Sequence, residues 1–266
     1  MAGASLRGID LRGAHIHDVN LEGAQLTDAW LVGADISGVI TGLRINEVEV
    51  GPLISAELDR RYPERVKLRP SDVAGLHEAW LLIEAMWGEA LGLALRLPEL
   101  RLHERVGGEW SFLETLRHLI FATDSWVFRM VLHDPAPYHH WGVAPAFLTD
   151  PAALGIDPSA DPGLADVLAA RAERMQRVAE LIDSLNPGDL DRVCAPPDDI
   201  GHPLEPYPLQ ACLRVVLDEE WAHCRYATRD LRVLLAGKIG PGNMGPGNIG
   251  PGSIGGDTSS DKGGPG

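Results

Sequence analysis

The chain has 266 residues, an apolar fraction of 45% and a formal net charge of −15 at pH 7. This length suits one substantial domain with appended segments, and the negative charge argues against nucleic acid and anionic membranes as partners. The N-terminus lacks a basic start followed by an apolar run, and no apolar stretch is long enough to cross a bilayer. The 3 cysteines include no CxxC pair, so we expect a protein of the reducing cytoplasm.

Residues 1–40 contain an internal repeat. Leucine or isoleucine recurs at every fifth position, with a small or apolar residue two positions before it. The series is Leu6, Leu11, Ile16, Leu21, Leu26, Leu31 and Ile36. A period of five fits neither a helix nor a strand and resembles a pentapeptide repeat, a square right-handed β-coil whose interior is filled by these residues. Because so short a coil has too few stacked layers to be stable alone, we predict a cap docked on the following domain.

Residues 41–69 form a predicted connector between the repeat and the rest of the chain. Residues 43–45 and 48–50 alternate in a way that predicts short strands. A short helix with proline in its first turn is predicted over residues 52–61.

Helices are predicted next, over about residues 71–95, 111–132, 163–185 and 209–236, from the helical spacing of their apolar residues. Ser111 and Glu114 form a capping-box signature at the start of the second of these. The loops over residues 133–162 and 186–208 are longer than a minimal bundle needs, and long loops are often functional or flexible. Residues 237–266 are too rich in glycine and proline to form a packed core, so we predict disorder there.

The last predicted helix carries acids and a histidine in its apolar stripe. His223 falls near the centre of the buried side, Glu219 lies one turn before it, and Glu220 is also within reach. A buried carboxylate must be paired. A Glu–His or Glu–Arg pair without metal, a divalent metal site, and acid–base catalysis without metal all remain open from this helix. His118 of the second helix could add a ligand, since open zinc sites take about three, although its helical wheel does not show that it points inward.

Two segments resemble the DinB/YfiT superfamily of metalloproteins. They are WSFLETLRHL (110–119) and EEWAHCRYATRDL (219–231). The resemblance covers about residues 70–236, and a pentapeptide-like leader is similar to an actinobacterial DinB-like subgroup. It implies a mainly α fold: a four-helix bundle in the order up-down-down-up, with a metal at one end.

The family's usual metal ligands are three histidines, and the matching positions here are His118, Glu219 and His223. The glutamate departs from the common pattern and is similar to the mycothiol-dependent maleylpyruvate isomerase branch, which uses His, Glu and His. The family spacing selects Glu219 over Glu220, a choice that the helical wheel leaves open.

The resemblance implies an enzyme in which a divalent ion, zinc or else nickel or iron, activates a thiol or water. We expect a small-molecule thiol S-transferase or a related transferase or isomerase. A low-molecular-weight thiol such as mycothiol would be one partner, a small-molecule substrate the other, and a homodimer is expected by analogy. The competing hypothesis is a structural or stress-related interaction module with a metal-free buried Glu–His pair.

Substrate contacts are predicted at two places, the long loop after the second helix and the end of the fourth. The predicted residues are Tyr138, His139, His140, Trp141, Arg225 and Tyr226. An ordinary surface loop and surface salt bridges are the competing interpretations for these residues.

Overall fold

The computed structural model describes residues 3–16 and 19–237. The chain divides into two compact units, residues 1–36 and 37–266. The predicted disorder of residues 237–266 concerns a segment that, after Gly237, lies outside the described residues.

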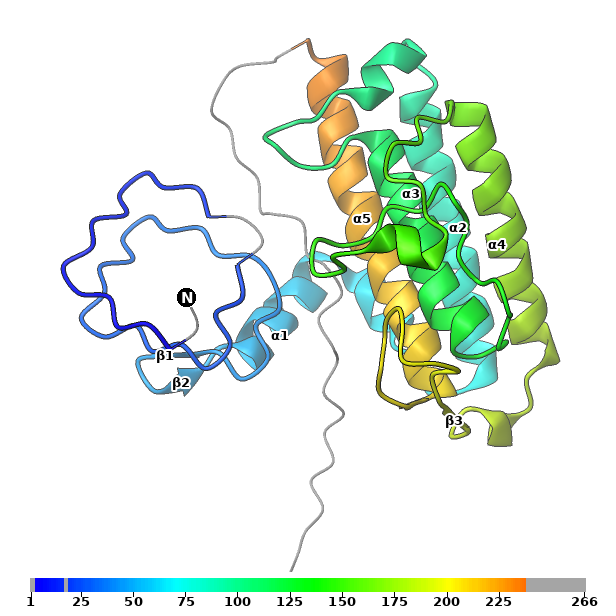
Figure 1. Ribbon diagram of the computed structural model, residues 1–266, viewed down its shortest axis with the longest axis horizontal. Helices are drawn as coiled ribbons and strands as arrows, with labels where there is room; N and C mark the ends of the chain where they lie inside the picture. Colours follow the sequence, from blue (N-terminus) through cyan, green and yellow to red (C-terminus); the bar gives the residue numbers. More distant parts are fainter. Residues whose placement is uncertain (1–2, 17–18, 238–266) are drawn as a thin grey trace, which may run out of the picture. The chain divides into compact units, whose positions relative to one another are not determined.

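The first unit repeats a left-handed backbone position every five residues. The glycines that hold it, with φ between 64° and 72°, are Gly3, Gly8, Gly13, Gly23 and Gly33. Asp28 occupies the same place in the series with φ 55°. Glycine suits this position because it has no Cβ to clash there, and the unit winds as an open coil (Figure 1).

The leucines and isoleucines of the repeat do not form a buried column within this unit. Their exposed fractions run from 45% at Leu31 to 66% at Leu6 and Leu26. The prediction that they fill an interior is therefore wrong for the unit by itself. A solenoid buries such side chains against the coils above and below, and this short segment offers too few coils. Docking of the unit on the helical domain stays a prediction.

The second unit begins with a hairpin and a short helix, as predicted. β1 (Arg44–Ile45) and β2 (Val48–Glu49) pair antiparallel. Asn46 and Glu47 join them with φ values of 48° and 69°, the left-handed conformation that a two-residue hairpin turn requires. α1 (Gly51–Arg61) has a proline in its first turn, where the missing N–H has no helical partner to lose.

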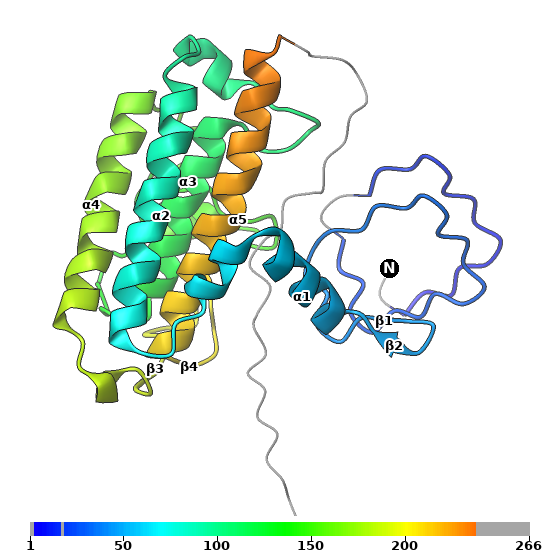
Figure 2. The same cartoon turned by 180° about the vertical axis from the view of Figure 1, so that it is seen from behind.

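A bundle of long helices makes up the rest of the unit (Figure 1). Its helices are α2 (Val73–Ala94), α3 (Phe112–Thr123), α4 (Leu164–Ser184) and α5 (Leu209–Leu235). The helices contact one another in a closed ring, in which α2 packs on α5, α5 on α3, α3 on α4, and α4 on α2. The view from behind shows α2 between α4 and α5 (Figure 2). α2 and α5 run one way while α3 and α4 run the other, which confirms the predicted bundle and its order.

Shorter elements connect the long helices. They are η1 (Pro63–Leu68), η2 (Glu99–His103), the π-helical turn η3 (Asp124–Arg129), η4 (Pro151–Leu154), η5 (Pro187–Asp189), β3 (Val193–Cys194) and β4 (Tyr207–Pro208). η3 continues α3 directly, and β3 pairs antiparallel with β4. Among the described residues, no helix combines the length and the apolar composition needed to cross a membrane.

The order of the helices explains the long loop over residues 133–162. Because α3 and α4 run in the same direction, the chain must return the length of the bundle between them (Figure 1). α4 has 21 residues, which span roughly 32 Å at about 1.5 Å per residue. The loop is therefore required by the topology, and part of it packs along α3.

The core is formed by the apolar stripes predicted for the helices. On α2, Leu76, Trp80, Ile83 and Trp87 are each at most 4% exposed, and each such side chain stabilises the fold by roughly 1.5–3 kcal/mol. α3 begins with the predicted capping box, in which Ser111 Oγ accepts from the backbone N–H of Glu114 at 3.2 Å.

Candidate metal centre

His118 lies on α3, the most fully buried of the four long helices. Every residue of α3 except Glu114 is buried, and the side chain of His118 is 0% exposed. The sequence could not show this orientation, because α3 is apolar nearly all round and its wheel has no clear polar face. The burial follows from its position, since α3 packs on both α4 and α5 and is covered by the loop that follows it.

The structure brings His118 together with two residues of α5. His223 Nε2 lies 3.1 Å from Glu219 Oε2, and His118 Nε2 lies 3.4 Å from the same oxygen. One ligand atom from each residue can be chosen so that all lie within 4.8 Å of one another. Ligand atoms around a tetrahedral zinc ion lie ~3.3 Å apart, given bonds of about 2.0–2.1 Å. The two separations from Glu219 Oε2 are close to this value, so His118, Glu219 and His223 form a candidate site for a divalent ion; we call them the triad.

A backbone hydrogen bond fixes which nitrogen of His118 is free. Nδ1 lies 2.9 Å from the carbonyl oxygen of Val143. A carbonyl oxygen only accepts, so Nδ1 carries the proton and donates it. In the neutral imidazole, Nε2 then holds a lone pair that faces the Glu219 carboxylate. Among the described residues, this buried Nε2 has no hydrogen-bond partner. A cation bound by both atoms would remove this unfavourable contact. In metal-binding histidines the other ring nitrogen commonly donates to a backbone carbonyl, which fixes the orientation of the ring.

The protonation states follow from burial and from the neighbouring groups. Burial lowers the pKa of His118, against the opposing effect of the neighbouring Glu219 carboxylate. Burial alone would raise the pKa of Glu219, but contacts with His118 and His223 outweigh it and lower the pKa to about 2. The site therefore presents a neutral imidazole at His118 and a carboxylate at Glu219, which are the forms that bind metals.

Glu220 has a different role, although it neighbours Glu219 in the chain. Its carboxylate accepts two hydrogen bonds from the Arg171 guanidinium of α4, at 3.1 and 2.8 Å. Both side chains are buried, with 6% of Arg171 and 1% of Glu220 exposed. The choice that the helical wheel left open is thus decided by packing: α4 supplies a cation to Glu220, and α3 supplies an imidazole to Glu219.

Aromatic rings enclose the triad. The indole of Trp110 lies 4.3 Å from the His118 ring and 5.8 Å from the His223 ring, centroid to centroid. Phe121 stacks on His118 at 6.1 Å, and Tyr226 meets His223 edge-on at 6.3 Å. Such apolar surroundings limit water access and strengthen electrostatic interactions inside the site.

The segment 138–143 of the long loop is held to α3 and η3 by hydrogen bonds. Arg117 Nε donates to the Trp141 carbonyl at 2.8 Å, and His118 donates to Val143 as described. The backbone N–H of His139 donates to Asp124 Oδ2 at 2.8 Å, while the other oxygen of Asp124 accepts from Arg174 of α4 at 2.9 Å. The segment therefore supports the triad through its backbone.

The predicted substrate-binding residues lie in three different settings. Tyr226 borders the triad, and Tyr138 reaches it through Phe121, on which it stacks at 5.6 Å. The rings of His139, His140 and Trp141 contact one another at centroid distances of 4.5–4.9 Å; the two imidazoles are stacked, and Trp141 is tilted against both. The Arg225 guanidinium lies over Tyr62 and Trp221, 4.0 and 4.6 Å from their ring centroids. Substrate contact by these residues stays a prediction.

Sequence reasoning missed the supporting groups of the triad, chiefly Val143 and Trp110. A backbone carbonyl leaves no signal in a sequence, so the partner of His118 Nδ1 could not be found that way. Trp110 does carry a signal, since it stands directly before the Ser111 cap of α3, where a large apolar residue often packs back onto the first turns of a helix.

The fold and the triad together define a helical-bundle protein with a candidate metal centre between two of its helices. The family model described as the DinB superfamily matches residues 82–227, which is more than half of the chain, and the chain belongs to that superfamily. The model for pentapeptide repeats matches residues 1–40 in 8 copies. Neither a curated protein nor a solved structure matches the chain.

Proposed function

We propose that this chain is a metal-dependent enzyme in which His118, Glu219 and His223 hold a divalent ion, zinc in the first place. The reaction we infer is the transfer of a small-molecule thiol to an electrophilic substrate, or a related isomerisation. The His–Glu–His set resembles that of the mycothiol-dependent maleylpyruvate isomerase branch of the superfamily.

The free Nε2 of His118 is the observation that carries the proposal. Its lone pair and the Glu219 carboxylate face each other at 3.4 Å inside the bundle. Two acceptors at that distance repel each other, and burial strengthens the repulsion. A divalent ion turns the same arrangement into a stable one, because both atoms become its ligands.

The protein's own residues orient and shield the site. Val143 holds the His118 ring in the tautomer that leaves Nε2 free, and Trp110 and Tyr226 cover the two imidazoles. When bound, a divalent ion of this kind supplies Lewis acidity, which lowers the pKa of a coordinated thiol or water. With three protein ligands, a tetrahedral ion keeps one position for that group.

On the substrate side, Tyr226 is the predicted contact best placed, since its ring lies against His223. Tyr138 is the next, on the far side of Phe121. We propose that these phenols border the electrophilic substrate, and that the ring contacts among His139, His140 and Trp141 fix the loop that carries Tyr138.

One observation favours a second candidate, a non-catalytic interaction module. His223 and Glu219 lie at hydrogen-bond distance, 3.1 Å, without any ion. That bond alone would satisfy a metal-free pair. It leaves His118 unexplained, however, and the metal proposal accounts for all three residues.

Metal analysis of the freshly purified full-length protein tests the proposal, together with His118→Ala and His223→Ala. His77→Ala is the matched control, because His77 lies at the bundle rim, 42% exposed and 3.5 Å from Asp183. We expect about one divalent ion per chain in the wild type and the control and almost none in the triad variants. Thiol transfer to a chromogenic electrophile should follow metal content. Unchanged metal in both triad variants would exclude the site, whereas metal without turnover would leave a structural centre.

A further inference from the structure

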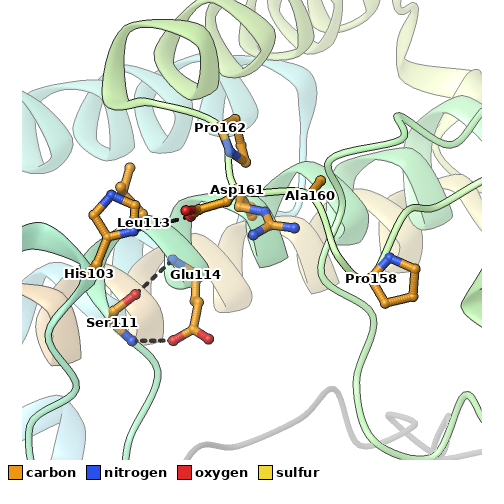
Figure 3. A pocket seen from close by; sticks show the side chains of 9 residues that line it. His103, Ser111, Leu113, Glu114, Pro158, Ala160, Asp161 and Pro162 are labelled. Atoms are coloured by element: carbon orange, nitrogen blue, oxygen red, sulfur yellow. Dashed lines mark hydrogen bonds and ion pairs between the residues drawn. The ribbon is translucent and has the colours of Figure 1, made fainter.

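A cavity with its own polar lining lies at the start of α3, beside the segment that leads into α4 (Figure 3). Its volume is about 250 Å³, and none of its lining residues belongs to the triad. That volume corresponds to roughly eight water molecules at about 30 Å³ each, so it admits a small organic molecule. Pro158 and Pro162 form stiff parts of its wall.

Arg117 is the buried cation of this cavity. Its side chain is only 8% exposed, and Nε is held by the Trp141 carbonyl at 2.8 Å. Among the described residues, its terminal nitrogens Nη1 and Nη2 have no hydrogen-bond partner. Burial lowers the pKa of Arg117, against the opposing charges of the nearby carboxylates Glu114, Asp161 and Asp157. A guanidinium stays protonated even so, and one whose Nε is already bound presents the N–H bonds of its two terminal NH2 groups to an acceptor.

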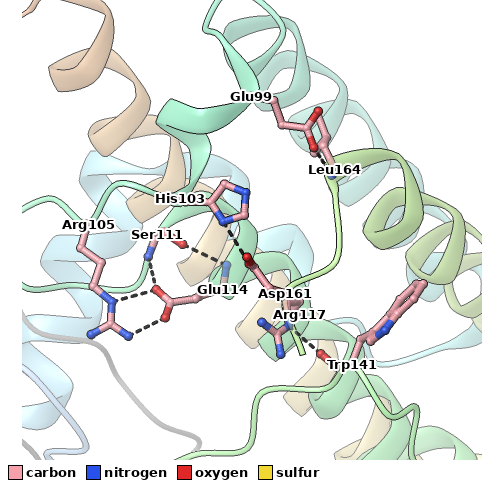
Figure 4. Close-up of polar contacts among 9 residues, drawn as sticks. All are labelled: Glu99, His103, Arg105, Ser111, Glu114, Arg117, Trp141, Asp161 and Leu164. Carbon is pink, nitrogen blue, oxygen red and sulfur yellow. Dashed lines mark hydrogen bonds and ion pairs between the residues drawn. The ribbon is translucent and has the colours of Figure 1, made fainter. Parts of the chain in front are cut away.

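The acidic residues of the cavity differ in how far they are already neutralised. Glu114 accepts from Ser111 in the capping box and from both ends of the Arg105 guanidinium. Among the described residues, the one ion pair of Asp161 joins its Oδ1 to His103 Nδ1 at 3.4 Å, and its side chain is 81% exposed. Figure 4 shows these contacts and the positions of Arg117 and Asp161 in the same part of the cavity. Within the described residues, the two do not form an ion pair with each other.

With respect to the described part of the chain, the lining therefore offers the free guanidinium edge of Arg117 and the free carboxylate oxygen of Asp161. A simple anion would meet Arg117 but be repelled by Asp161, and a simple cation would meet the opposite problem. A molecule with a carboxylate and an ammonium group a few ångströms apart satisfies both. Guanidinium binds a carboxylate with two parallel hydrogen bonds, which also fixes its orientation.

We propose that this cavity is a second binding site, for a small zwitterion of the α-amino acid class. Its carboxylate binds Arg117, its ammonium group binds Asp161, and a short side chain lies against the prolines of the wall. None of its proposed contacts involves a residue of the triad, and the site requires no metal.

Titration of the ¹⁵N-labelled full-length protein with L-alanine, acetate and ethylammonium tests the proposal through the amide shifts of Arg117 and Asp161. We expect saturable binding of L-alanine, roughly tenfold tighter than either single-charge probe, because each probe lacks one charge-assisted contact. Asp161→Asn should weaken L-alanine binding roughly tenfold. Asp166→Asn, at an exposed acid of the first turn of α4, is the matched control and should leave it unchanged.

Asp161→Asn is the decisive variant, because its exposed side chain can change without disturbing the fold. Arg117→Gln should also abolish binding, but it removes a loop contact as well. Absence of saturation by L-alanine up to about 50 mM, a binding free energy of only about −2 kcal/mol, would overturn the proposal. Acetate binding as tightly as L-alanine, with no effect of Asp161→Asn, would overturn it too and indicate a plain anion site.

Discussion

Replacing Glu219 and Glu220 separately by glutamine distinguishes the two neighbouring carboxylates by opposite effects. Glu220→Gln leaves the Arg171 guanidinium buried, with 6% of its side chain exposed, and without its anionic partner. Breaking a buried ion pair from one side lowers the free energy of unfolding by about 3–5 kcal/mol. For a domain of this size that corresponds to a drop in Tm of roughly 6–20 °C. Metal binding should be unchanged.

Glu219→Gln should do the reverse. The variant loses the charged partner of His223 at 3.1 Å, but its amide can donate to the free Nε2 of His118 at 3.4 Å. These changes are each worth about 1 kcal/mol and oppose each other, so the metal-free variant should unfold within about 1–2 kcal/mol of the metal-free wild type. Its metal affinity should fall by more than the roughly 10–100-fold that is typical when a residue that only hydrogen-bonds to a metal ligand is lost.

The assay is urea unfolding of both variants and the wild type, each stripped with chelator and then reloaded with zinc. Zinc at about 100 times its Kd should stabilise the wild type and Glu220→Gln by about 2.7 kcal/mol, with little gain for Glu219→Gln. Wild-type zinc affinity in Glu219→Gln, or loss of zinc in Glu220→Gln, would refute the assignment. A loss of stability in metal-free Glu219→Gln as large as that in Glu220→Gln would instead favour a metal-free structural pair.

Two further predictions concern other buried groups. Burial lowers the pKa of His202 to about 4, with the charge of Arg129 acting in the same direction. Between pH 6.5 and 4, His202 is therefore protonated in the unfolded chain but neutral in the folded protein. The free energy of unfolding falls as the pH falls through that window, by at most roughly 3 kcal/mol. His202→Gln should remove this part of the pH dependence of urea unfolding, and an unchanged profile would contradict it. Burial raises the pKa of Cys224 to about 12, so the folded protein should resist alkylation there at pH 8 and Cys224→Ala should keep its metal. Mass spectrometry measures the labelling of Cys224, and rapid labelling in the folded protein would contradict this prediction.

Much of the fold follows from local sequence patterns. Helical spacing of apolar residues placed α2, α4 and α5 within about two residues of their observed bounds, because that spacing reflects which face of a helix must leave water. Ser111 and Glu114 marked the start of α3 through their own side-chain chemistry. The five-residue period likewise appears in the backbone as a regular series of left-handed positions.

Burial inside the repeat unit could not be read from the same pattern. The period places Leu6 and Leu26 on one side of each unit, yet both are 66% exposed. A sequence pattern indicates which side chains favour burial, whereas their actual burial depends on how many coils of the solenoid lie above and below them. For that reason the sequence predicted the repeat correctly but predicted the burial of its leucines and isoleucines wrongly.

For the candidate site, the sequence determined that a carboxylate and an imidazole lie one turn apart on the buried face of α5. Only the tertiary structure decided their partners. In the folded bundle His118 points inward, its Nδ1 donates to the Val143 carbonyl, and its Nε2 faces Glu219. The packing of α4 on the bundle also places Arg171 in an ion pair with Glu220. The physical reason is that a helix fixes the directions of its own side chains, while the groups that meet them come from other helices and loops, whose positions depend on packing across the whole bundle.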